Sequence, residues 1–264
     1  FVTKYASDLP KADRQMAELT TAKLLHDIIS TSSHTAGGMD GITPAEATLL
    51  GIVPLHWIAM LMNAVEFDGM DWPEQTRHVK LAPQHRIGET ADTALAFRLI
   101  AIMSWLTRTW EKRKLRSLQP WLDKWVPESF YTCVKGRGAA DAIFKTSLMW
   151  EHQRAFDLDT TGGSGDIEKA YDALLRIIGY FLAIHAGLDP RTLCAYIKLQ
   201  ESLIYYVTYG TAGIGEGRHH SRGFPQGGPL SQVLLALPMV VWHSHIVKNW
   251  VEAIPRVLAD DLRF

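Results

Sequence analysis

Apolar residues recur at helical spacing through much of the first 155 positions. Thr43, Pro44 and Glu46 stand in the order of a capping box with proline at the first helical position, and they place the start of one helix. Trp72-Pro73 breaks the helical pattern, and the alternation over 77–83 predicts a short strand. The periodicity predicts helices over residues 8–29, 44–65, 97–118 and 139–154.

After residue 155 the pattern becomes mixed. It predicts helices over 171–186 and 230–248, the second with Pro238 inside it. Residues 203–209 are rich in β-branched and aromatic side chains and lead through a glycine-rich turn into a polar run, which predicts a β-hairpin. A last strand is predicted over 256–264, interrupted by two acids. This order predicts an α+β fold, helix-rich first and mixed afterwards.

Bulk composition predicts a folded protein in a reducing, intracellular compartment. Of the 264 residues, 47% are hydrophobic, too many for a disordered chain. Cys133 and Cys194 cannot make a disulfide framework, and no Cys/His pair has zinc-site spacing. The best membrane candidate, Leu230 to Trp242, is too short to span a bilayer. We therefore expect no membrane partner.

The net charge of -1 hides a basic block between Arg77 and Arg116. This block holds nine bases and three acids and so carries a charge of +6. It is compatible with a nucleic-acid or nucleotide surface, although the block alone favours a solvated helix face. The tryptophans near the block could stack on bases, but we expect them in the core: Trp105, Trp110, Trp121 and Trp125.

Three acids stand in strand-like surroundings. Asp166 follows a glycine-rich approach, and Asp260-Asp261 lie within an otherwise apolar strand pattern. Buried carboxylates need a cation, and oxygen ligands without His or Cys favour Mg²⁺ or Mn²⁺. An isolated Asp-Asp pair is more often an exposed turn, so the metal interpretation depends on the rest of the chain. His219-His220, His243 and His245 are weaker metal candidates.

A glycine-rich loop over residues 222–231 carries one amide side chain, Gln226, and leads into an apolar helix. Loops of this kind let backbone and a polar side chain approach a flat ligand or a sugar closely. Taken alone, it is an ordinary turn before a helix.

In their order along the chain, these blocks resemble those of the reverse transcriptase family, most closely the branch from retrotransposons without long terminal repeats. The resemblance covers most of the chain. Three blocks resemble the first palm motif, the Gln-Gly-x-Pro-Leu-Ser motif and the Tyr-x-Asp-Asp motif: residues 166–172, 223–231 and 259–261. Four earlier blocks resemble the N-terminal and fingers motifs of the family: Gly38–Ile42, Trp72–Pro83, Phe97–Ala101 and Lys135–Ala142.

The resemblance implies a right-hand polymerase. Residues 1–155 would be an N-terminal extension and fingers, with the family's fingers helix beginning at Phe97, and 156–264 a palm cut short after its Asp-Asp motif, without a thumb. Asp166, Asp260 and Asp261 would be catalytic and would hold two Mg²⁺ ions, or Mn²⁺, with help from the Ile167 carbonyl. Because the chain starts at Phe1 and stops at Phe264, we expect a piece of a longer protein that adds a thumb and could add an endonuclease.

The resemblance also implies a nucleotide site. Tyr171 would lie under the incoming sugar and exclude a 2′-hydroxyl, Gln226 would contact the nucleotide or template, and Arg98 would hold the triphosphate. The family's second fingers cation is replaced by Gln84, so Lys80 or Arg86 would take its part. Gly227, Pro229 and Leu258 would lie along template and primer. Leu258 replaces the family's tyrosine, and Thr-Thr-Gly-Gly-Ser-Gly stands before Asp166 where the family has an apolar strand.

The expected activity is RNA-directed DNA synthesis for a retroelement, with an RNA template, a DNA or RNA primer and deoxynucleotides as partners. In a eukaryote its location would be the nucleus or cytoplasm. Two alternatives stay open: an RNA-directed RNA polymerase, and a decayed relic that binds nucleic acid without catalysis.

Overall fold

The chain folds into two units, each built from segments far apart in the sequence. Unit 1 comprises residues 1–14, 118–188 and 232–264, and unit 2 comprises 15–117 and 189–231. The computed structural model describes residues 2–5, 7, 9, 11, 16–85, 96–159, 161–210, 213–258 and 261–263, with the side chains of 2, 3 and 261–263 left out. The fold is mixed α+β. The expected boundary between fingers and palm at residue 156 stays a prediction.

The first helix of unit 2, α2 (Thr21–Ile29), is shorter than the periodicity predicts. It begins after Thr20, whose hydroxyl accepts a hydrogen bond from the N–H of Lys23. Residues 16–19 before it are not helical, and two of their N–H groups donate to side chains instead of to helical carbonyls. Met16 N–H donates to Asp189 Oδ2 and Leu19 N–H to Asn63 Oδ1, both at 2.8 Å.

Where one helix was predicted over 44–65, two are found, α3 (Pro44–Ala47) and α4 (Ile52–Phe67). The capping box at Thr43 is confirmed, with the Glu46 carboxylate accepting the Thr43 N–H at 2.7 Å. The chain then turns and restarts, with extended Gly51 as the N-cap of α4. Helix α4 packs against both α2 and α9 (Pro190–Ser202).

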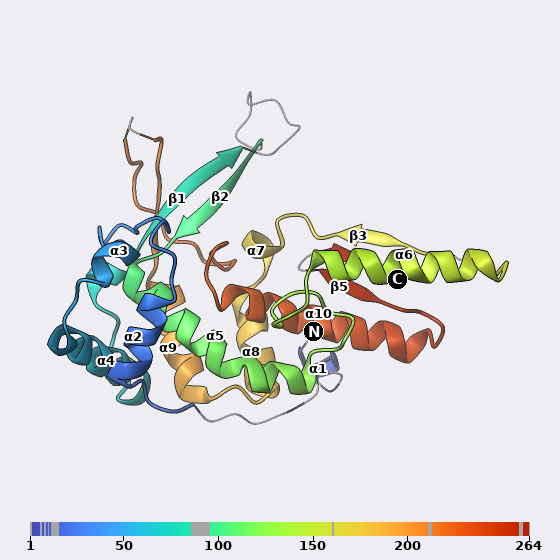
Figure 1. Cartoon of the computed structure of the whole chain (residues 1–264), viewed down its shortest axis with the longest axis horizontal. Helices are drawn as coiled ribbons and strands as arrows, with labels where there is room; N and C mark the ends of the chain where they lie inside the picture. The colour runs from blue at the N-terminus through green and yellow to red at the C-terminus, as the bar shows by residue number, and fades with distance from the viewer. Residues whose placement is uncertain are drawn as a thin grey trace. The chain divides into compact units, whose positions relative to one another are not determined.

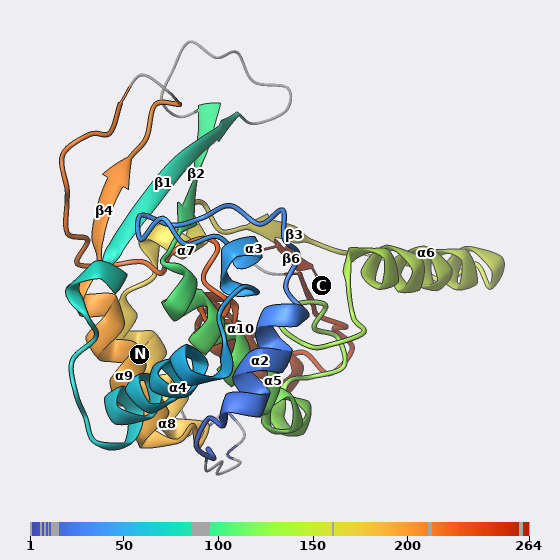
Figure 2. The same cartoon turned by 60° about the vertical axis from the view of Figure 1, so that its left-hand side comes forward.

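A three-stranded sheet of order β2-β1-β4 completes unit 2. Strand β1 (His78–His85) follows the short η2 (Glu74–Thr76) and pairs antiparallel with β2 (Phe97–Ile102) and parallel with β4 (Ile204–Val207). The β1–β2 ribbon extends away from the helices of the unit (Figure 1), and β4 lies along its other side (Figure 2). The helix predicted from Phe97 is wrong over its first six residues, because the ladder with β1 satisfies their backbone as a strand. The hairpin predicted after residue 203 is partly right. The polar segment after β4 turns back along it but, among the described residues, forms only two isolated antiparallel bridges, Tyr205 with Arg218 and Thr208 with Ile214.

Helix α5 (Trp105–Trp125) runs from unit 2 into unit 1. Its first N–H, on Trp105, donates to Asp40 Oδ2 at 2.7 Å, so the Gly38–Ile42 block serves as its N-terminal support. In unit 2, Trp110 packs edge-on against Trp72, whose indole N–H donates to Ala195 O at 2.9 Å. The expectation that the tryptophans near the basic block lie in the core is confirmed: Trp105, Trp110, Trp121 and Trp125 are all buried.

Unit 1 contains an antiparallel sheet of order β3-β6-β5. Its strands are β3 (Ser164–Asp166), β5 (Arg256–Leu258) and β6 (Asp261–Arg263), so the single strand predicted over 256–264 is a hairpin. The helix predicted over 171–186 is two helices, α7 (Ala170–Ala173) and α8 (Arg176–His185), because Leu174 and Leu175 between them are extended.

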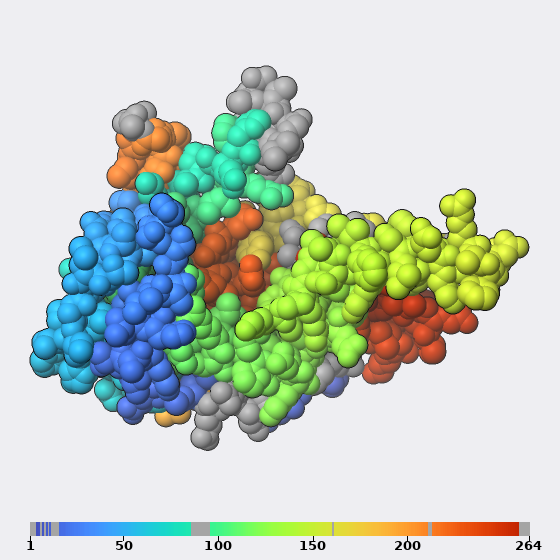
Figure 3. Space-filling model, viewed as in Figure 1, coloured from blue at the N-terminus to red at the C-terminus, as the bar shows by residue number. Residues whose placement is uncertain are grey.

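Three further helices belong wholly or mainly to unit 1. Helix α1 (Val2–Tyr5) is one turn, and α10 (Ser231–Asn249) confirms the helix predicted through Pro238. Helix α6 (Ala139–Ala155) is also confirmed, and none of its residues is buried. In the space-filling view of Figure 3, the atoms of α6 (yellow-green) lie at the surface that faces the viewer. Within the described part of the chain, no helix is long and apolar enough to cross a membrane.

Candidate active site

Two of the three predicted metal-binding acids lie on adjacent strands of unit 1. Asp166, at the end of β3, is the direct partner of Asp261, at the start of β6, in an antiparallel ladder. Asp261 in turn pairs with Leu258 on β5. Asp166 has an exposed side chain. Asp260, between β5 and β6 in the sequence, lies outside the described residues, as does the side chain of Asp261.

Direct cross-strand partners project from the same face of a sheet, with Cβ atoms about 4.5–5.5 Å apart. The register therefore brings the backbones of two residues that the resemblance makes metal ligands directly opposite each other. Among the described side chains no group of three metal-binding residues occurs. The carbonyl of Ile167, the other expected ligand, accepts the N–H of Ala170 at 3.2 Å.

The β5–β6 hairpin is fixed within unit 1 by its first strand. Val257 is fully buried, its N–H donates to Ser129 O at 3.1 Å, and its carbonyl accepts the Tyr131 N–H at 2.9 Å. The guanidinium of Arg256 donates to Thr146 Oγ1 on α6. Leu258, expected beside the primer, is half-buried on the same strand.

Tyr171 lies on α7, in the same unit as Asp166, and is half-buried. Between them the chain turns through Lys169, which takes a left-handed conformation with φ of 51°. Helix α7 begins directly after this turn, four residues after the acid, and Tyr171 is its second residue.

The expected triphosphate contacts lie in unit 2, on β1 and β2. Arg98 is exposed and belongs to strand β2, which corrects the expectation that it begins a fingers helix. Its direct cross-strand partner is Gln84, the position at which the resemblance expects a second cation. Lys80 is half-buried on β1, and Arg86 lies outside the described residues.

The glycine-rich loop of residues 223–230, called the QG loop below, is held against β2. The carbonyl of Gln226 accepts the N–H of Ala101 at 2.8 Å, three residues along the strand from Arg98. Gly227 has φ of +124°, and a Cβ there would lie 2.6 Å from the Ala101 carbonyl oxygen. Gln226 and Pro229 are half-buried. The structure therefore joins Gln226 and Gly227 to the strand that carries Arg98.

The other end of the QG loop contacts Glu111, a residue that the motifs do not single out. Glu111 Oε2 accepts the N–H of Leu230 at 2.9 Å, and the side chain is fully buried on α5. Burial raises its pKa to about 8, with the Leu230 N–H opposing the shift. The spacing of α5 contains a signal for it, since Thr107, Glu111, Lys114 and Leu118 follow one buried stripe at intervals of four, three and four.

Most cations in the α5 part of the basic block have partners inside unit 2. Arg116 pairs with buried Asp27, Arg113 lies 3.7 Å from the same carboxylate, and Arg108 donates to Ala36 O at 2.7 Å. Burial also lowers the pKa of Lys112, with Arg116 and Arg108 adding to the effect. These cations therefore mainly stabilise the fold of unit 2. Their partners argue against a nucleic-acid surface on this part of the block, and also against a solvated helix face.

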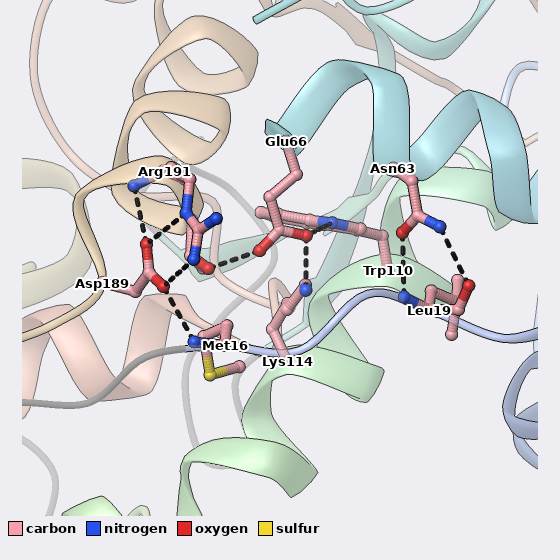
Figure 4. Close-up of polar contacts among 9 residues, drawn as sticks. Met16, Leu19, Asn63, Glu66, Trp110, Lys114, Asp189 and Arg191 are labelled. Atoms are coloured by element: carbon pink, nitrogen blue, oxygen red, sulfur yellow. Dashed lines mark hydrogen bonds and ion pairs between the residues drawn. The ribbon is translucent and has the colours of Figure 1, made fainter. Parts of the chain in front are cut away.

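A buried polar cluster joins α4, α5 and α9 (Figure 4). Glu66 pairs with Lys114 and accepts hydrogen bonds from Thr192 and, at 3.4 Å, from the Trp110 indole. Both members of the ion pair are almost completely buried. Because both carboxylate oxygens and the ammonium have partners within the cluster, its role is to fasten the three helices together.

The histidine candidates have other partners. His243 Nε2 lies 2.7 Å from Ser129 Oγ, and burial lowers its pKa. His245 contacts Asn249 one turn along α10, and His220 stacks on Tyr205 with ring centroids 4.3 Å apart. His219 is exposed.

No known protein-family model matches this chain, and no curated protein sequence matches it significantly.

Proposed function

We propose that the chain is the fingers and palm part of an RNA-directed DNA polymerase, as its motifs suggest. The observation that carries the proposal is the cross-strand pairing of Asp166 with Asp261 on an antiparallel sheet. The two residues belong to segments that resemble separate polymerase motifs, and the resemblance makes both of them metal ligands. In the structure they are direct neighbours on adjacent strands. A chance occurrence of the two motifs would give no reason for this register.

The residues to which the resemblance gives a role are found in both units, and each unit is considered by itself. Unit 1 has the carboxylates and Tyr171, and unit 2 has Arg98, Lys80 and the QG loop. Arg98 is exposed and its guanidinium suits the oxygens of a triphosphate. Gln226 is fixed at its backbone, which leaves its amide side chain to contact the nucleotide or template.

In the proposed reaction the carboxylates of Asp166 and Asp261, with Asp260, hold the charge that binds divalent cations. Such cations, when bound, neutralise the primer 3′-oxygen and the departing pyrophosphate in an in-line displacement. Tyr171 limits the room at the sugar 2′ position and so favours deoxynucleotides. Arg98 and Lys80 orient the phosphates, which lowers the entropy cost of reaching the reactive geometry.

The test is primer extension on an RNA template with a DNA primer, Mg²⁺ or Mn²⁺ and labelled deoxynucleotides. Wild-type protein should extend the primer, and Asp166→Asn and Asp260→Ala should abolish extension. Asp159→Asn, the same charge change at an exposed position of unit 1, should leave extension intact. Incorporation of ribonucleotides would instead support an RNA-directed RNA polymerase. Template binding by folded protein without extension would support a relic.

A further inference from the structure

The QG loop is clamped at two places within unit 2. At one place Ala101 of β2 donates to the Gln226 carbonyl, and at the other Leu230 donates to Glu111 of α5. Gly228 lies between them, and a Cβ at this position would come 2.6 Å from Ser231 Oγ and 3.3 Å from Glu111 Oε2. The loop backbone therefore packs directly on the carboxyl group, with no room for a side chain.

The surroundings of Glu111 do not provide for a negative charge. Its Oε1 atom is buried and has no hydrogen-bond partner among the described residues. The two groups of the QG loop that approach it, the Leu230 N–H and Gly228, are uncharged. The nearest cations along its own helix do not act on its pKa, and Lys114 is paired with Glu66.

We propose that Glu111 is a positioning residue of the QG loop: as a neutral carboxylic acid it accepts the Leu230 N–H and keeps the loop in the conformation that holds Gln226 and Gly227 against β2. That this conformation serves nucleotide binding rests on the proposed function.

Ionisation of Glu111 works against this arrangement. A carboxylate at this site would lose its hydration without gaining a cation, which is costly in a buried position. An ionised oxygen is a better acceptor for the Leu230 N–H, but this single hydrogen bond does not compensate for the lost hydration. The loop therefore opens and lets water reach the carboxylate. Because burial raises the pKa of Glu111 from its ordinary value of 4.5 to about 8, the closed loop loses stability progressively between these two pH values.

Hydrogen exchange of peptides that cover residues 223–231 tests the proposal without using activity. In wild-type protein, protection relative to intrinsic exchange should fall about 100-fold between pH 6 and pH 9, because the closed loop loses about a factor of ten per pH unit until the pH reaches the pKa of about 8. Glu111→Gln, which keeps an acceptor oxygen but cannot ionise, should be protected equally at both pH values. Exchange in β1 should be unchanged in both proteins, which separates loop opening from global unfolding. Both proteins contain the same lysines, so titration of lysine near pH 9 cannot cause a difference between them, and any difference comes from Glu111.

Glu111→Leu, which keeps the volume and removes the acceptor, should lose loop protection at both pH values. If Glu111→Leu keeps wild-type protection, or if Glu111→Gln shows the same loss at pH 9 as the wild type, the proposal is overturned. Should Glu111→Leu fail to fold, the comparison of wild type with Glu111→Gln still decides.

Steady-state kinetics then connect the loop to the nucleotide. The KM for the deoxynucleotide should rise in wild-type protein between pH 6 and pH 9 and stay level in Glu111→Gln, with kcat changed less than KM. A wild-type protein that extends no primer would overturn the proposed function alone, because the exchange experiment reads the loop directly. Normal extension with an exchange pattern independent of Glu111 would overturn the positioning role alone.

Discussion

Asp166 and Asp261 are direct partners across the β3–β6 ladder. Two like charges in this position destabilise a sheet by about 0.5 kcal/mol when no cation lies between them. The proposed cation site therefore predicts that unit 1 is less stable without a bound divalent cation than with one.

Replacing one member of this pair should show the repulsion directly. Without divalent cations, Asp261→Asn should raise the free energy of unfolding by about 0.5 kcal/mol, because the repulsion is removed. Addition of Mg²⁺ or Mn²⁺ should stabilise the wild type but not the variant. Thermal unfolding with and without the cation measures both effects. An Asp159→Asn control should respond to Mg²⁺ as the wild type does, and an equal response of Asp261→Asn would argue against a cation at the pair.

The buried ion pair of Glu66 and Lys114 should behave differently when it is broken and when it is replaced. Lys114→Met leaves a buried carboxylate without its cation and should cost about 3–5 kcal/mol. The double variant Glu66→Leu/Lys114→Met removes both charges and should recover much of that loss. Denaturant unfolding of the single and double variants completes the cycle. A double variant as unstable as the sum of the singles would mean that the pair has no coupling.

Glu111 should make stability fall as the pH rises. The unfolded chain releases this proton near its ordinary pKa of 4.5, whereas the folded protein keeps it to about 8. Between these values the unfolded state binds fewer protons, so the free energy of unfolding decreases with pH, by at most about 5 kcal/mol over the whole window. The contribution is complete below pH 4.5 and lost by pH 8. Glu111→Gln should lack this slope, while Glu74→Gln, an exposed control, should keep it; denaturant unfolding at pH 5 and pH 8 compares them.

Gly227 should tolerate a side chain less well than Gly213, which also has a positive φ but has no atoms near the position of an added Cβ. Gly227→Ala would put a Cβ 2.6 Å from the Ala101 carbonyl in addition to the strain of its positive φ. Gly213 has φ of +149° with nothing within 4 Å, so Gly213→Ala carries the backbone strain alone, about 1–3 kcal/mol. The difference in unfolding free energy between the two variants measures the close approach of loop and strand. Equal losses would mean that the QG loop can move away from β2 at no cost.

Local signals in the sequence predicted local features well. The capping box at Thr43, the helix over 139–154 and the burial of the tryptophans are all found in the structure. These features depend on neighbouring residues or on strong hydrophobicity, which a periodic pattern reports directly.

Features that depend on distant partners were not predictable in this way. Phe97–Ile102 has the apolar content of a helix, but pairing with β1 makes it a strand. Residues 16–19 before α2 are not helical, and the N–H groups of Met16 and Leu19 donate to the side chains of Asp189 and Asn63. In the sequence, Glu111 looks like any other charged residue of a helix rich in charges. Only the structure shows that its side chain is buried and accepts the N–H of Leu230 from the QG loop. Asp260 and Arg86 lie outside the described residues, so their expected roles stay predictions.

The interleaving of the two units has a consequence for how the protein is made. Strand β4 must be synthesised before it can cover the free edge of β1, and β6 before it can pair with β3. At translation rates of about 5–20 residues per second, the edge of β1 waits roughly 6–24 s for β4. An exposed strand edge over that time invites pairing with other chains, which makes the nascent protein a candidate client of chaperones. Unit 1, which holds the first residues of the chain, therefore cannot complete its sheet until β6 has been made, after the last segment of unit 2.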